Sequence, residues 1–110
     1  MADINFSQLV KEMLNAAKEP LIAHWNEAKP LAEKEFKAFA ENIKLIAKLK
    51  IAGDITEEQA KLYLEIQKGS IRIFLLTVKG LGILAVESAI NAAISMVKNT
   101  VNTALGWNIL

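Results

Sequence analysis

The hydrophobic pattern of the first half of the chain predicts two amphipathic helices. Over residues 5–18, apolar side chains recur with the i, i+3, i+4, i+7 spacing of one helix face. Over residues 21–51 they recur at steps near 3.5, and charged side chains occupy the opposite side. Pro20 should end the first helix or lie in the first turn of the second. Pro30 should kink the second helix or split it at Lys29.

The strongest local signal is the turn at residues 52–56. Gly53 suits the left-handed position that follows a helix end. Thr56, with Gln59 three residues later, predicts a capping box at the start of the next helix. Because the turn is short, the helices on either side of it should form an antiparallel hairpin.

The second half of the chain is predicted to form two further helices, over residues 57–79 and 83–105. Their polar residues follow two stripes whose centres are rotated by about 110° at 100° per residue. A chain reversal at Gly80 and Gly82 accounts for this rotation. We therefore expect an all-α fold, a bundle of three to four helices that forms a single domain over residues 1–110.

Charge is distributed unevenly along the chain. Residues 1–68 hold 21 of the 25 charged side chains, and the other four are Arg72, Lys79, Glu87 and Lys98. The last two helices are therefore apolar over about two-thirds of their circumference, where a surface helix buries only one face. A compact bundle, a homo-oligomer or a membrane could cover this surplus, and we favour the homo-oligomer.

The expected interface lies on the last helix and the tail that follows it. Its residues are Ile83, Leu84, Val86, Ile90, Ile94, Val97, Val101, Leu105 and Trp107. Trp107 could fold back onto its own bundle, dock on a neighbouring subunit or anchor at a lipid interface. Glu87 is a candidate buried carboxylate, with Arg72 or Lys79 of a neighbouring subunit as its partner. If Glu87 instead lies on the solvent-exposed polar stripe of its helix, it should titrate like an ordinary glutamate.

Two alternative functions remain open. A membrane-active protein would insert its last helices, but the eight strongly apolar residues of segment 80–97 supply only about −2.4 to −4.8 kcal/mol. Glu87 opposes insertion by about 2.5 to 3.5 kcal/mol, so spanning would require a partner for this carboxylate. A carrier would enclose a hydrophobic ligand in the apolar core.

Composition gives no support to catalysis or to cofactor binding. The chain has no cysteine, and its one histidine, His24, makes at most half a metal site with Glu27. The net charge of +1 and the single arginine argue against a nucleic-acid partner. We expect no enzyme activity, no cofactor and no bound metal.

The function that the sequence favours is that of a small, non-catalytic structural or assembly protein whose partner is itself. Residues 1–6 show no secretory signal, so a cytoplasmic location is the default expectation.

Overall fold

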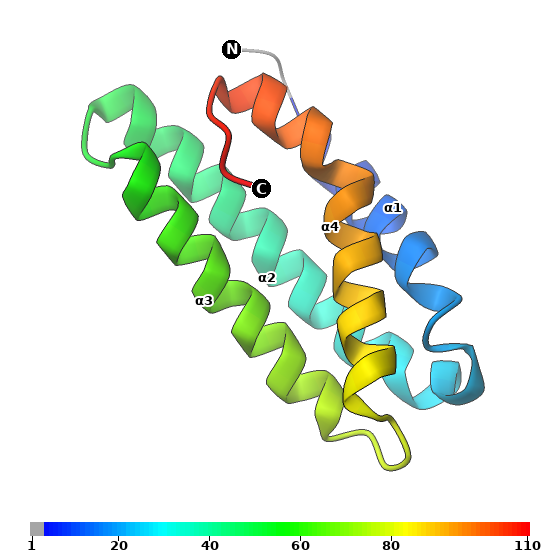
Figure 1. The fold of residues 1–110 in the computed structure, drawn as a ribbon. Helices are drawn as coiled ribbons and strands as arrows, with labels where there is room; N and C mark the ends of the chain where they lie inside the picture. Colours follow the sequence, from blue (N-terminus) through cyan, green and yellow to red (C-terminus); the bar gives the residue numbers. More distant parts are fainter. Residues whose placement is uncertain (1–3) are drawn as a thin grey trace.

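A computed structural model describes residues 4–110, and within this range the chain is an all-α helical bundle (Figure 1). Its elements are α1 (Phe6–Lys18), the 3₁₀ turn η1 (Ile22–His24), α2 (Trp25–Ala52), α3 (Glu57–Leu76) and α4 (Ile83–Leu105). The predicted fold class is confirmed. The prediction that no secretory signal is present concerns residues 1–6, of which residues 1–3 lie outside the described residues.

The hairpin between α2 and α3 is built as the sequence predicts. Gly53 has φ +76° and closes α2 in the left-handed conformation. The Gln59 backbone N–H donates to Thr56 Oγ1 over 3.1 Å, and the Thr56 N–H donates to Gln59 Oε1 over 2.9 Å. This complete capping box satisfies two donors that the first turn of α3 would otherwise leave free.

The start of α2 differs from its prediction. Pro20 lies in a turn after α1, the 3₁₀ turn η1 follows, and α2 begins at Trp25, four residues later than expected. The chain does not split at Lys29, because α2 continues through Pro30 to Ala52. Pro30 is in the second turn of the helix, so its missing N–H removes one hydrogen bond near the end and leaves the rest of the helix intact.

A chain reversal separates α3 from α4, as the rotated polar stripes predict. The helix α3 ends at Leu76, three residues earlier than expected, and the Thr77 hydroxyl donates to the Phe74 carbonyl over 2.6 Å. Gly80 has φ +93°, and Gly82 is the N-cap of α4. Residues 57–105 are therefore two helices joined by a tight connection.

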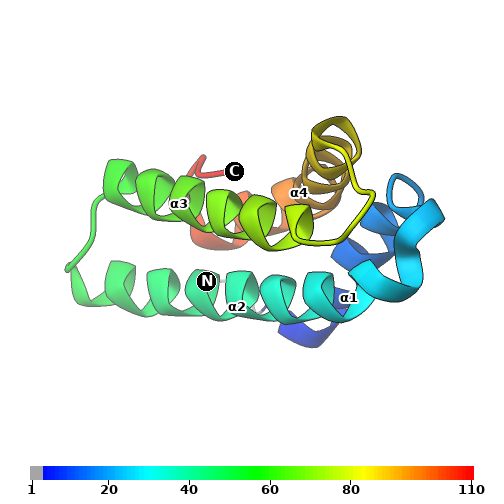
Figure 2. The same ribbon diagram turned by 90° about the horizontal axis from the view of Figure 1, so that it is seen from below.

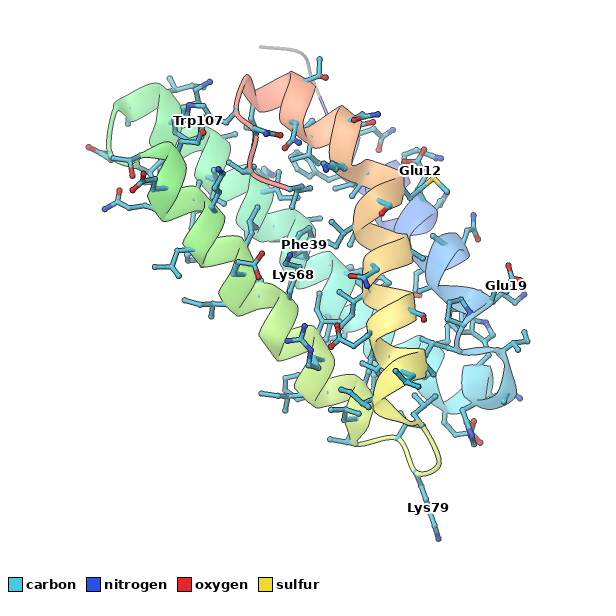
Figure 3. The ribbon with its side chains drawn as sticks, in the orientation of Figure 1. Glu12, Glu19, Phe39, Lys68, Lys79 and Trp107 are labelled. Carbon is cyan, nitrogen blue, oxygen red and sulfur yellow. The ribbon has the colours of Figure 1, made fainter. Side chains whose placement is uncertain are left out.

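The two ribbon views show α2 and α3 side by side along their length, whereas α1 and α4 complete the bundle (Figures 1 and 2). Helix α1 packs against both α2 and α4, and α3 packs against α2 and α4. Figure 3 places Phe39 at the centre of the bundle. The largest fully buried side chains include Leu9, Met13, Phe36, Phe39, Ile43, Leu64, Ile90 and Leu105. They belong to one continuous core with contributions from all four helices.

We expect Gly80→Ala to destabilise the protein more than Gly53→Ala does. Both glycines have positive φ, which costs an L-residue about 1–2 kcal/mol. A Cβ at Gly80 would also lie 2.6 Å from His24 Cε1, whereas nothing lies within 4 Å of a Cβ at Gly53. Urea unfolding should therefore show the larger loss for Gly80→Ala, and adding His24→Ala should recover part of it. Equal losses would mean that His24 does not pack against Gly80.

Candidate self-association surface

Five of the residues predicted to form an interface are core residues in the structure. Exposure is 2% or less for each of Val86, Ile90, Val97, Val101 and Leu105. Because α1 and α3 pack on α4, these side chains are covered by their own chain. Ile94 is half-buried against the same core. Of the predicted interface residues, only Ile83 and Leu84, at the start of α4, are exposed, at 49% and 81%.

Trp107 is held on its own bundle. Lys50 Nζ lies 4.8 Å from the centre of the Trp107 ring and also donates to the Leu105 carbonyl. Asn102 fixes the tail that follows, since its Oδ1 accepts the backbone N–H groups of Ile109 and Leu110, each over 3.0 Å. In the single chain Trp107 therefore lies folded back on its own bundle.

Glu87 is half-buried, and its partner comes from the same chain. Arg72 Nε and Nη2 donate to the two Glu87 oxygens, in a bidentate pair that joins α3 to α4. The side chains of Glu87 and Arg72 are 35% and 38% exposed. Hydrogen bonding from Arg72 outweighs partial burial and lowers the pKa of Glu87, whereas burial alone would raise it. The same hydrogen bond raises the pKa of Arg72.

We expect Glu87→Gln to lower the free energy of unfolding near neutral pH by less than about 1 kcal/mol, since solvent screens a half-exposed pair. The folded-state pKa of Glu87 is lowered, so the pair stabilises the fold above the ordinary pKa of a glutamate. That contribution is lost as the pH falls through the folded-state pKa. Urea unfolding from neutral pH to pH 3 should show the two proteins converging in acid. A constant difference would contradict this assignment, and Glu33→Gln, which removes the exposed pair with Lys37, is the control.

A stripe of exposed apolar side chains runs along α3. We define the outer face of α3 as Leu62, Ile66, Gly69, Ile73 and Leu76. Its four large side chains are 63%, 62%, 66% and 40% exposed. The buried side chains of α3, which include Leu64, Ile71 and Leu75, point in the opposite direction, about 180° away at 100° per residue. Helix α3 is therefore apolar on two faces, of which its own chain covers one.

The spacing of the outer face is that of a helix-pairing seam. Its residues follow one another at steps of four, three, four and three, which is the heptad spacing of side chains that interlock between two helices. From Leu62 to Leu76 the seam is about 21 Å long at 1.5 Å per residue. Gly69 lies at its centre, and nothing lies within 4 Å of where its Cβ would be. A mid-helix glycine costs about 0.5–1 kcal/mol relative to alanine, and no contact within the chain requires one here.

The two flanks of the outer face differ in charge. One flank carries Glu58, Glu65 and Arg72 at seven-residue spacing, Lys61 and Lys68 lie on the same charged side, and Lys79 follows beyond the end of α3. Figure 3 shows Lys79 projecting away from the α3–α4 connection. The other flank carries only uncharged residues, Tyr63, Ser70 and Thr77. Their side chains bond within the chain, for Tyr63 donates to Asn42 over 3.0 Å and Ser70 to Glu35 over 3.2 Å.

Neither a closed ligand cavity nor a metal centre stands out among the described residues. An open groove of about 470 Å³ lies between α1 and α2. Phe6, Val10 and Leu14 line it together with Lys11, Glu33, Lys37 and Glu41, so its wall is partly charged. Residues 4–110 bring no three histidine or acidic side chains together in a metal-binding cluster. The sequence candidate His24 instead faces Gly80.

Sequence analysis missed two features of this surface. The heptad spacing of the outer face is present in the sequence, but it does not stand out there because α3 is apolar over most of its circumference. The burial of Glu35 was not predicted, although this residue lies beside Phe36 on the apolar side of α2. The structure places Glu35 between α2 and α3 with 7% exposure, where it accepts the Ser70 hydroxyl.

Comparison with protein-family models, with curated proteins and with solved structures finds no match to this chain. No helix in the described part of the chain combines the length and the hydropathy needed to cross a bilayer.

Proposed function

We propose that the protein is a small, non-catalytic assembly protein that associates with itself through the outer face of α3. The observation that carries the proposal is the exposed seam of Leu62, Ile66, Ile73 and Leu76, which runs at heptad spacing along a helix already packed on its other side. Contiguous exposed apolar side chains of this size mark interaction surfaces.

The proposal moves the interface from α4 to α3. Most large apolar side chains of α4 are buried in the core of its own chain, and those left exposed are Ile83, Leu84 and Met96. Ile83 and Leu84, exposed at the start of α4, follow directly on the α3–α4 connection. These two residues would extend the rim of an interface centred on α3.

A second copy of the chain suits the outer face of α3 better than a lipid surface does. Helices that lie on membranes carry lysine and arginine on the polar side, which bind anionic headgroups. The charged flank of α3 instead mixes the two signs, because Glu58 and Glu65 alternate with Lys61 and Lys68, and Arg72 is paired with Glu87. Acidic side chains beside the apolar stripe oppose binding to an anionic membrane and supply opposite charges for another copy of α3.

The test is the absolute mass by light scattering after size exclusion, with and without a mild detergent. We expect a discrete oligomer of the 12.1 kDa chain whose mass does not depend on detergent. A monomer throughout the micromolar range would contradict the proposal. Flotation with phosphatidylcholine or phosphatidylserine vesicles would favour membrane action, and a hydrophobe in an organic extract of the purified protein would favour the carrier.

A further inference from the structure

We infer that two copies of the chain pair antiparallel through the outer face of α3, about a two-fold axis near residues 67–69. In this arrangement Glu65 of each copy faces Arg72 of the other. The inference rests on the proposed self-association and deepens it, because it specifies which residues meet.

The charged flank favours the antiparallel orientation. Its N-terminal half holds Glu58, Lys61 and Glu65, whereas its C-terminal half holds only basic side chains, Lys68 and Arg72, and Lys79 follows beyond the end of the helix. When two such helices run antiparallel, the acidic half of each lies beside the basic half of the other. A two-fold axis between residues 68 and 69 brings Glu65 of each copy opposite Arg72 of the other, and it places Glu58 of each copy near the end of α3 that leads to Lys79 in the other. Charges that flank a helix seam set orientation in this way.

A parallel pair would lose these contacts. In a parallel pair the charged flank of one helix faces the other flank of its partner. That flank consists of Tyr63, Ser70 and Thr77, so no pair of opposite charges would form. The charge pattern of α3 is therefore complementary to a second copy of itself in one orientation only.

The apolar seam fits an axis at nearly the same point, between residues 67 and 68. It places Ile66 of one copy over Gly69 of the other and Leu62 of one copy against Ile73 of the other. Gly69 has no side chain and no neighbour within 4 Å of its Cβ position, so the large side chain of Ile66 has room there. This contact gives the mid-helix glycine a role, since small residues allow two helices to approach closely.

Contacts within the chain leave both charged groups able to pair. Arg72 uses Nε and Nη2 for Glu87, which fixes the guanidinium on this side of α3 and leaves Nη1 to donate to another carboxylate. The Glu65 side chain is 65% exposed and holds Lys68 through Oε1 over 2.6 Å. Its second oxygen can accept from Arg72 of the other copy.

Disulfide cross-linking distinguishes the two orientations, and the chain has no native cysteine to interfere. Leu62→Cys and Ile73→Cys are purified separately, and each is oxidised alone and in a 1:1 mixture. We expect the mixture to form the mixed disulfide at least about tenfold faster than either variant cross-links to itself, because pairing raises the effective concentration of the two thiols. The light-scattering mass of each sample under reducing conditions accompanies the experiment.

The remaining outcomes separate failure of this inference from failure of the proposed function. Faster cross-linking of each variant to itself would show a parallel pair, which overturns the inference and leaves self-association intact. Reduced samples that are oligomeric but form no disulfide would place the interface away from the outer face of α3. Monomeric wild-type protein at the concentrations used would overturn the proposed function itself.

Discussion

Replacing both Ile66 and Ile73 with glutamate is expected to convert the self-associated protein into a folded monomer. These side chains are 62% and 66% exposed in the single chain, so neither supports its core. Complete burial of an isoleucine is worth about 1.5–3 kcal/mol. Each of these side chains is about two-thirds exposed in the single chain, and a dimer contains four of them, so the double variant loses about two-thirds of that value at four positions. The loss is at least about 4 kcal/mol, which weakens the dimer by about 1,000-fold.

Sedimentation equilibrium measures this loss, and circular dichroism checks that the helices remain. The matched control is Ile22→Glu with Met96→Glu. These residues are 61% and 54% exposed, so the control introduces two glutamates at similarly exposed apolar positions. Met96 lies about 180° around α4 from Glu87, whose side chain joins α4 to α3, so Met96 is on the side of α4 that faces away from α3. If the control dissociates the assembly as strongly as the double variant on α3 does, the interface is not centred on α3.

Ile90→Asp is expected to unfold the protein at any concentration. Ile90 is 2% exposed and packs in the core shared by the four helices. The substitution removes a buried aliphatic side chain, which costs about 2–5 kcal/mol, and leaves a carboxylate without a partner. Since small domains are stable by about 5–15 kcal/mol, most of the folded population should be lost. Far-ultraviolet circular dichroism during a urea titration measures the change.

Asn91→Asp is the control, because it adds the same charge at the exposed neighbouring position. It should unfold close to the wild-type midpoint. A folded but dissociated Ile90→Asp protein would contradict the assignment of this residue to the core. It would return the interface to α4, where the sequence first placed it.

Local signals in the sequence predicted the helices and their ends well. The capping box of Thr56 and Gln59 depends on two residues three positions apart, so its contacts follow from the sequence directly. The rotation between the two polar stripes, together with the glycines at 80 and 82, predicted the chain reversal. The start of α2 was less predictable, because Pro20 and Pro30 restrict the backbone without specifying which residues become helical.

The apolar surface of α4 illustrates what a sequence leaves open. A side chain such as Val97 must be buried, but its hydrophobicity is the same whether its own chain or a second chain covers it. The structure shows that its own chain covers it. Contacts between distant residues, such as Lys50 with Trp107 and Arg72 with Glu87, likewise depend on how the helices are placed in space.

Isotope-filtered nuclear Overhauser spectroscopy tests the central claim most directly. A 1:1 mixture of ¹³C-labelled and unlabelled protein reports only contacts between different copies. The proposed interface predicts intermolecular signals at the methyl groups of Leu62, Ile66, Ile73 and Leu76, and none at the buried methyl groups of Val97 and Val101. The absence of intermolecular signals on α3, in a sample whose mass shows an oligomer, would contradict the outer face of α3 as the self-association surface.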